Sequence, residues 1–293
     1  MSKATKKNIT IALAGNPNVG KSTLFNALTC AAAESANYPF CTIEPNVGVV
    51  DVADNRLNEL AELYHTNKVI PAQIEFVDIA GLVKGASEGA GLGNKFLSHI
   101  KEVDAIVHVV RCFKNDKIIH VEGSVDAIRD IETINLELIL ADIDSVTKRI
   151  EKIRKQVHGG AADIQTQKEY ELLNKIMDLL KDQKPARLLK VEAEEKKIVD
   201  GFFLITTKPI IYVANTADEL DEFQKENIER IKEIAKVENA EVVAVPDVYP
   251  MGWERTLIKQ VFNKEYDRLS ISMSEYGANF AGGTVTKICK IVQ

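Results

Sequence analysis

The segment GNPNVGKS at residues 15–22 constrains this chain more than any other feature, because it fits the pattern G-x-x-x-x-G-K-[ST]. It follows an apolar run at residues 9–14 and opens a segment, residues 21–30, whose apolar side chains recur at helical spacing. Strand, loop and helix in this order predict a phosphate-binding loop, since the glycines let successive N–H groups face one centre and the helix N-terminus adds partial positive charge. The residues expected to bind a nucleotide here are Asn16, Pro17, Asn18, Val19, Gly20, Lys21, Ser22 and Thr23.

Further residue types complete the chemistry that such a loop needs. Lys21 is expected to reach the β and γ phosphates, and the Ser22 hydroxyl to bind Mg²⁺. An apolar run at residues 74–77 ends in Asp78, which forms the pattern D-x-x-G with Gly81. We expect Asp78 to orient Mg²⁺ and the Gly81 N–H to contact the γ-phosphate and so to sense hydrolysis. In the Pro-containing loop that precedes this run, Thr42 is expected to complete the Mg²⁺ shell with its hydroxyl.

The stretch after Asp78 predicts a switch loop. Residues 81–93 contain five of the 16 glycines in the chain, too many for an ordered helix or strand. Short apolar runs also occur at residues 105–110, 210–213 and 242–245. Runs of this type suit strands that are covered on both faces, so the sequence predicts an α/β fold with a mostly parallel sheet, as in G-domain-like P-loop NTPases.

Residues 121–203 differ in composition from the rest of the chain, because they are rich in Glu, Lys, Ile and Leu. Two amphipathic segments meet at Gly159 and Gly160, which predicts a helical hairpin. It is either a projecting coiled coil or an ordinary helix pair packed on the sheet. The expected division is a P-loop domain of residues 1–120 and 204–293, with the helical insertion at 121–203. The seam of the first helix would be formed by Ile139, Ile143, Val146, Ile150, Ile153 and Val157.

Composition narrows the classes of partner. The chain has 293 residues, 45% hydrophobic and 27% charged, with 37 basic and 43 acidic residues and a net charge of −6. This balance argues against a general nucleic-acid coat, and we expect no sequence-specific DNA binding. No apolar stretch is long enough to span a membrane, and no signal-peptide core follows the N-terminus, so a cytoplasmic monomer is expected. The four cysteines, which lack metal-site or disulfide spacing, are Cys30, Cys41, Cys112 and Cys289.

Taken together, these motifs resemble those of the Obg-like ATPase family, also called YchF, of P-loop NTPases. The resemblance rests on NPNVGKSTLFNALT at 16–29, PFCTIEPN at 39–46 and above all VDIAGLVKGA at 77–86. It continues through GLGN at 91–94 and into IIHV at 118–121. It implies an ATP-hydrolysing switch that acts with the ribosome or ribosome-associated factors, and a coiled-coil insertion. The match decays beyond about residue 240, so the family's C-terminal TGS domain is expected to be absent.

Two departures from Ras-like enzymes concern catalysis and base recognition. The residue after D-x-x-G is Leu82, where Ras-like enzymes have a Gln that orients the attacking water. The resemblance implies His120 as the catalytic residue that replaces it; taken alone, the residues favour a surface histidine. The N-K-x-D motif of guanine-specific enzymes reads Asn215-Thr216-Ala217-Asp218 here, without the lysine. We therefore expect ATP to be preferred, with GTP as the alternative.

The role of Asn18 and the overall activity each allow more than one interpretation. Asn18 either helps to bind a K⁺ ion between the phosphates or is a turn residue that tolerates a left-handed conformation. The chain is either a hydrolysing switch or a protein- or RNA-binding module that uses the nucleotide as a structural ligand. A metabolic kinase is disfavoured, because no acceptor-binding motif is visible. A ribosome-facing patch is expected at Lys148, Arg149, Lys152, Arg154 and Lys155.

Overall fold

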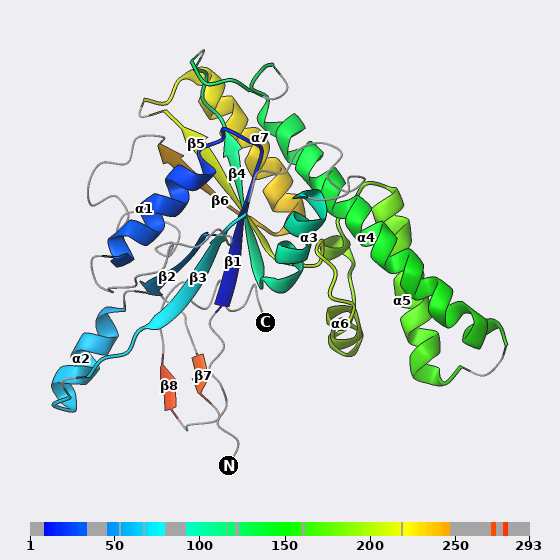
Figure 1. The fold of residues 1–293 in the computed structure, drawn as a ribbon. Helices are drawn as coiled ribbons and strands as arrows, with labels where there is room; N and C mark the ends of the chain where they lie inside the picture. Colours follow the sequence, from blue (N-terminus) through cyan, green and yellow to red (C-terminus); the bar gives the residue numbers. More distant parts are fainter. Residues whose placement is uncertain are drawn as a thin grey trace.

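A six-stranded sheet forms the centre of the molecule in a computed structural model (Figure 1). Its strand order is β2-β3-β1-β4-β5-β6, and every neighbouring pair is parallel except β2 with β3. The strands are β1 (Ile9–Ala14), β2 (Asn46–Val52), β3 (Ala72–Asp78), β4 (Ala105–Arg111), β5 (Ile210–Thr216) and β6 (Glu241–Pro246). The structure describes residues 9–33, 46–52, 54–66, 68–79, 92–115, 117–120, 123–159, 162–217, 219–246, 271–273 and 278–280.

Helices cover both faces of this sheet. The helices of the described residues are α1 (Lys21–Ala33), α2 (Asn55–Leu63), α3 (Leu92–Glu102), α4 (Ala127–His158), α5 (Ile164–Lys181), the 3-10 turn η1 (Ala186–Leu188), α6 (Ala193–Asp200) and α7 (Glu222–Glu238). Those that pack on the sheet are α1 on one face and α3, α7 and the first half of α4 on the other. A separate antiparallel pair consists of β7 (Ile271–Met273) and β8 (Ala278–Phe280). The predicted α/β fold with a mostly parallel sheet is confirmed, and β2 adds an antiparallel edge strand that the sequence pattern did not predict.

The apolar runs of the strands supply two cores, one on each face of the sheet. Along β1, Ile11 and Leu13 pack with α1, whereas Ala12 and Ala14 pack on the opposite side, where α3, α4 and α7 lie. This alternation follows from the two-residue period of a strand. Since both sets are buried, residues 11–14 of β1 have to be apolar, and the strand carries the phosphate loop on a rigid base.

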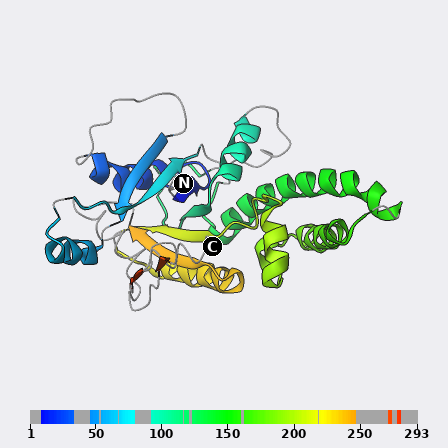
Figure 2. The ribbon, with the colours of Figure 1, turned by 90° about the horizontal axis from the view of Figure 1, so that it is seen from below.

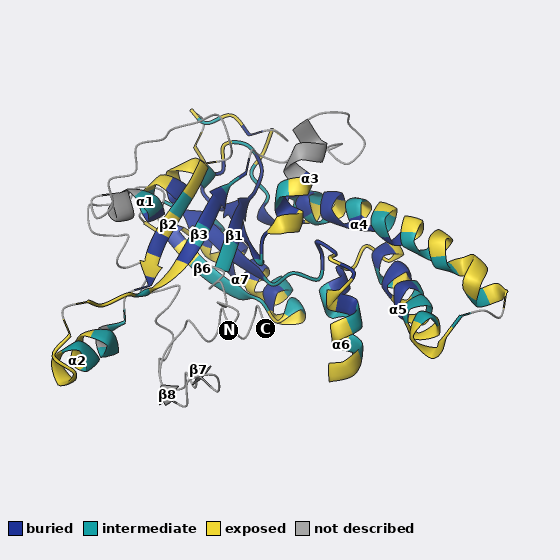
Figure 3. Ribbon diagram, turned by 60° about the horizontal axis from the view of Figure 1, so that its bottom comes forward, coloured by how far each residue is buried: buried dark blue, intermediate teal, exposed yellow. Residues whose placement is uncertain are grey.

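α4 is a single helix of 32 residues with two different environments. Its first half packs on the sheet through Ile131, Ile134 and Leu138. Its second half leaves the sheet and packs on α5, as the projecting arm in Figures 1 and 2 shows. Ile139 and Val146 of the predicted seam are buried there, and the outer surface of the arm is exposed (Figure 3). The proposed domain boundaries at residues 121 and 203 stay a prediction.

Asp142 fastens α4 to the chain that returns from the arm. Its carboxylate accepts hydrogen bonds from the backbone N–H groups of Ile205 and Thr206, at 2.9 and 2.7 Å, and from the Thr206 hydroxyl at 2.7 Å. Burial raises the pKa of the Asp142 carboxyl, although these donors act in the opposite direction. This contact sets where the arm leaves the sheet. Within the described ranges, no helix is both long and apolar enough to cross a membrane.

Candidate nucleotide-binding site

The loop between β1 and α1 has the backbone that the sequence predicts for a phosphate loop. At Gly15, an added Cβ would lie 2.6 Å from the carbonyl oxygen of Val109 on β4, so only glycine fits against that strand. Gly20 has a φ of 90° and Asn18 a φ of 62°, which places both in the left-handed region. Val19 is buried in the core beneath the loop, and this anchors the loop to the sheet.

Three polar side chains, two from the start of α1 and one from the end of β3, meet beside this loop. Lys21 Nζ lies 2.8 Å from Asp78 Oδ1, and the Ser22 hydroxyl donates to Asp78 Oδ2 at 2.8 Å. Their proximity follows from the sheet, because β1 and β3 are parallel neighbours and Leu13 pairs with Asp78 in register. The Lys21 and Asp78 side chains are only 10% and 7% exposed, so the ion pair is largely shielded from water. The residues predicted from two separate motifs are therefore together in space.

The donor set of this cluster fits Mg²⁺. A hydroxyl and a carboxylate are hard oxygen ligands, and Mg²⁺ in nucleotide sites completes its shell with water and phosphate oxygens. No group of three or more His, Cys, Asp or Glu side chains arranged for a metal occurs among the described residues. Such a cage is not needed at a phosphate loop, where Ser22 and Asp78 would be the protein's contribution.

Asn215 and Thr216, the first two residues of the segment that corresponds to the N-K-x-D motif, lie at the end of β5 and make different contacts. The Asn215 amide donates to the Val19 carbonyl at 2.9 Å and so joins the end of β5 to the phosphate loop. Thr216 is buried, and its hydroxyl donates to the carbonyl of Val245 on β6 at 3.2 Å. Its side chain therefore packs against the neighbouring strand β6. In the first turn of α7, the Gln224 side chain accepts a hydrogen bond from the Ala217 N–H at 2.7 Å and donates one to the Glu219 carbonyl at 3.1 Å.

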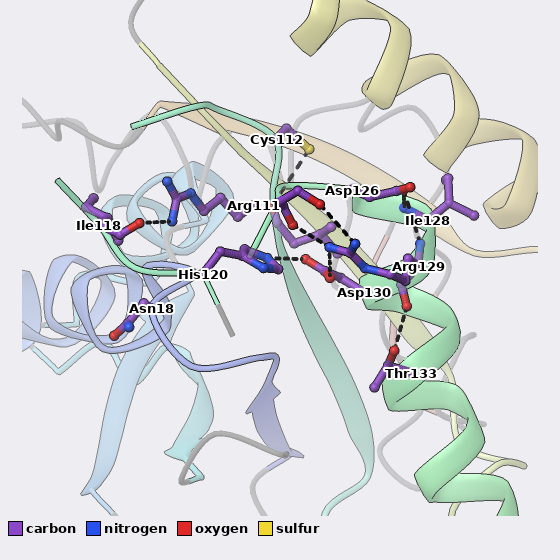
Figure 4. Close-up of polar contacts among 12 residues, drawn as sticks. Asn18, Arg111, Cys112, Ile118, His120, Asp126, Ile128, Arg129, Asp130 and Thr133 are labelled. Atoms are coloured by element: carbon purple, nitrogen blue, oxygen red, sulfur yellow. Dashed lines mark hydrogen bonds and ion pairs between the residues drawn. The ribbon is translucent and has the colours of Figure 1, made fainter. Parts of the chain in front are cut away.

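The segment between β4 and α4 lies directly beside the phosphate loop (Figure 4). The Asn18 side-chain amide donates to the Ile119 carbonyl at 3.1 Å. His120 is turned toward α4, where its Nε2 lies 2.8 Å from Asp130 Oδ2. Burial raises the pKa of the Asp130 carboxyl, and the hydrogen bond with His120 opposes that effect. The structure thus places His120 in a hydrogen-bond contact with Asp130, and its catalytic role stays a prediction.

Arg111, which the sequence did not single out, organises the same segment. Its guanidinium is buried at the end of β4 and donates to the carbonyls of Phe113, Asn115 and Ile118 at 3.0 to 3.1 Å. The side chain also stacks on the Phe113 ring, with 4.7 Å from Cζ to the ring centroid. The signal that could have identified it is an arginine that directly follows six apolar or aromatic residues, since such a residue continues a buried strand. A buried guanidinium needs several hydrogen-bond acceptors, so it is expected to organise the chain around it.

Some predicted positions lie outside the described residues. These are Thr42, Gly81, Leu82 and Asp218, together with the glycine-rich stretch at 82–91. Of the four cysteines, Cys112 is the one whose packing the structure describes; it is free and buried, and burial raises its pKa to about 12. It is therefore a neutral thiol in the core, as expected of a reduced structural cysteine.

Sheet order, phosphate loop and the Lys21–Asp78 contact define a P-loop nucleoside triphosphatase domain of the GTPase type. Residues 10–175, more than half of the chain, match the family model described as 50S ribosome-binding GTPase. A Buchnera aphidicola protein named ribosome-binding ATPase YchF is 45% identical over 260 residues, which cover 85% of this chain and 70% of that protein. The chain belongs to the YchF family.

Further relatives agree with this assignment. The Bacillus subtilis protein of the same name is 54% identical over 239 residues, which cover 81% of this chain and 65% of the relative. The structure of the Schizosaccharomyces pombe YchF GTPase matches with a TM-score of 0.65 and 35% identity, over 86% of this chain and 68% of that one. The chain thus spans just under two thirds of the Bacillus subtilis relative.

Proposed function

We propose that this protein is a Mg²⁺-dependent ATPase that acts as a switch in the cytoplasm. The observation that carries the proposal is the contact of Lys21 and Ser22 with Asp78 beside a phosphate loop of the expected backbone. In this proposal the Lys21 ammonium binds the β and γ phosphates, and its charge is stabilising where negative charge develops during transfer. Ser22 and Asp78 would hold the metal, and bound Mg²⁺ would supply further neutralisation of the phosphates.

The two switch residues of the proposal are Thr42 and Gly81. Thr42 would add its hydroxyl to the metal shell, and the Gly81 N–H would bind the γ-phosphate. Loss of the γ-phosphate would remove both contacts, and the loops that contain them would be released toward a partner. Replacement of Lys21 by Ala is the first test, because it should abolish hydrolysis while the fold, measured by circular dichroism, is retained.

ATP is the proposed nucleotide, with GTP as the alternative. In guanine-specific sites a lysine stem flanks the base, whereas here that position is Thr216, whose side chain is buried against β6. Among the relatives, the bacterial proteins are named ATPases and the Schizosaccharomyces pombe protein is named a GTPase. Competition between ATP and GTP for the purified protein decides the matter. A GTP preference beyond tenfold, about 1.4 kcal/mol, would overturn the proposal.

His120 is the proposed residue for positioning the attacking water, in the role that Gln has in Ras-like enzymes. His120→Ala should lower kcat and leave ATP affinity nearly unchanged; a large loss of affinity would contradict this role. Asn18 is the residue on which a K⁺ ion would depend. Hydrolysis measured in K⁺ and then in Na⁺ tests that idea, and equal rates would remove it.

The ribosome is the proposed partner, as the names of the bacterial relatives suggest for those proteins. The outer part of α4 contains three exposed basic residues for such a contact, Lys152, Arg154 and Lys155. The outer surface of the arm as a whole is exposed (Figure 3). Arg149, in contrast, donates to the Gly201 carbonyl at 3.1 Å and stacks on Phe202, so it is engaged within the arm. Charge reversal at Lys152, Arg154 and Lys155 should weaken stimulation of hydrolysis by ribosomes.

The matched control for that experiment is Lys232→Glu on α7. Lys232 is also a surface lysine, but it lies on α7 and not on the arm. Its ammonium is 2.7 Å from the carboxylate of Glu229 on the same helix. It should change neither basal hydrolysis nor stimulation. Equal loss of stimulation in the control and the α4 variant would mean that general charge, and not this face of the arm, determines binding.

A further inference from the structure

His120 lies in a segment that is held to both the phosphate loop and α4. Asn18 of the phosphate loop donates to the Ile119 carbonyl at 3.1 Å, and Arg111 Nη1 donates to the Ile118 carbonyl at 3.1 Å. One residue further on, His120 Nε2 is 2.8 Å from Asp130 Oδ2 in the first turn of α4. Figure 4 shows His120 and Asp130 facing one another across the gap between the segment and the helix.

Burial decides what His120 can do in this arrangement. The His120 and Asp130 side chains are only 5% and 3% exposed. A water that attacks a phosphate has to contact both the phosphate and the residue that orients it, and a general base has to lie within hydrogen-bond reach of that water. A ring that is buried against Asp130 offers no accessible edge for such a water. In this conformation the imidazole is a structural partner of α4.

We propose that Asp130 is a positioning residue that withholds His120 from the phosphate site until the hydrogen bond between the two side chains opens. This inference rests on the proposed function, since it concerns the regulation of the same hydrolysis. The pair acts as a latch, a term used here for the His120–Asp130 contact. While the latch is closed, His120 is stored against α4 and turnover is slow. Once it opens, the ring is free to reach the nucleotide.

The surrounding contacts give the latch two inputs. One is the phosphate loop: an occupant that engages the Asn18 amide would release the Ile119 carbonyl and so loosen the residue next to His120. The other is α4 itself. Asp130 lies at the start of the same continuous helix that carries Lys152 and Lys155 about 33 to 38 Å further along. A partner that displaces the whole of α4, including the half that packs on the sheet, would move the carboxylate away from the histidine.

The test is steady-state ATP hydrolysis by Asp130→Ala without ribosomes. A hydrogen bond to a carboxylate biases an equilibrium by about tenfold or more, so kcat should rise by a factor of that order at unchanged KM. The gain should vanish in the Asp130→Ala/His120→Ala double variant. Thr133→Ala is the matched control, because Thr133 lies one turn further along α4 and its hydroxyl donates to the Arg129 carbonyl of the same helix. A kcat for Asp130→Ala at or below that of the wild type would overturn the proposal.

A second variant and a second readout apply if Asp130→Ala fails to fold. Asp130→Asn keeps the size of the side chain and weakens the contact, and it should give a smaller increase in kcat. Site-resolved modification of the wild type by diethyl pyrocarbonate, without added nucleotide, should spare His120 and label the exposed His158. Equal labelling of the two residues would overturn the latch. Absence of ATP hydrolysis in every variant and in the wild type would instead overturn the proposed function, while the labelling still reports whether the latch is closed.

Discussion

Asp78→Asn should make ATP bind more tightly in the absence of Mg²⁺. Lys21 Nζ is 2.8 Å from Asp78 Oδ1, and the pair is nearly buried. A triphosphate that binds Lys21 has to compete with this carboxylate for the ammonium group. Asparagine keeps the size of the side chain and one acceptor oxygen but removes the charge, so the competition for Lys21 is weakened.

The expected size of the effect follows from the strength of that contact. A hydrogen bond to a charged group contributes about 1.5 to 3 kcal/mol and a neutral one about 1 kcal/mol. The difference of about 0.5 to 2 kcal/mol corresponds to about two- to thirtyfold tighter binding of Mg²⁺-free ATP. With Mg²⁺ present the same substitution should weaken binding, because a ligand of the metal shell has lost its charge.

Titration of a fluorescent ATP analogue, once in EDTA and once in Mg²⁺, measures both effects. Asp51→Asn is the matched control, because Asp51 lies on the exposed edge strand β2, away from the phosphate loop. Its carboxylate accepts a hydrogen bond from the Gln73 side chain on β3 at 2.8 Å. It should leave both affinities unchanged. If Asp78→Asn bound Mg²⁺-free ATP no more tightly than the wild type, the Lys21–Asp78 pair would not compete with phosphate, and the reasoning would be refuted.

Three further predictions concern stability and selectivity. Asp142→Ala removes three buried hydrogen bonds, two of them from Thr206, and should lower the free energy of unfolding in urea by about 3 kcal/mol; a loss below about 1 kcal/mol would count against its role in fastening the arm. Burial lowers the pKa of His108 to about 3, so the unfolded chain binds more protons and stability should fall as the pH drops from 6.5 toward 3, by up to about 5 kcal/mol; persistence of that pH dependence in His108→Gln would exclude His108 as its source. Thr216→Ala should cost about 1 kcal/mol of stability and leave the ratio of ATP to GTP affinities unchanged, because the hydroxyl is bonded to β6; an altered ratio in competition assays would place this side chain at the base.

The sheet was predictable because each of its central strands contains a short apolar run. Residues 105–111 of β4 are all buried, and such a run is visible in the sequence. β2 was missed for the opposite reason. Only Val50 and Val52 among its residues are buried, since it lies at the edge of the sheet, and a half-exposed strand with a glycine has the composition of a loop.

The phosphate site was predictable to the extent that its chemistry is local. The loop and D-x-x-G are short motifs, and the parallel pairing of β1 with β3 brings their ends together. The contacts of Arg111, Asp130 and Gln224 were not predictable in this way. Each depends on where the chain returns after a strand, and no spacing in the sequence encodes that His120 meets a carboxylate ten positions away on a helix that packs on the sheet.

The central claim is that this chain hydrolyses ATP at the site formed by Lys21, Ser22 and Asp78. Its most direct test is Mg²⁺-dependent hydrolysis of ATP by the purified protein and by Lys21→Ala, with and without ribosomes. The account predicts slow turnover by the wild type, faster turnover with ribosomes, and none by the variant in either condition. Equal turnover by the variant, or no turnover by the wild type even with ribosomes, would contradict it.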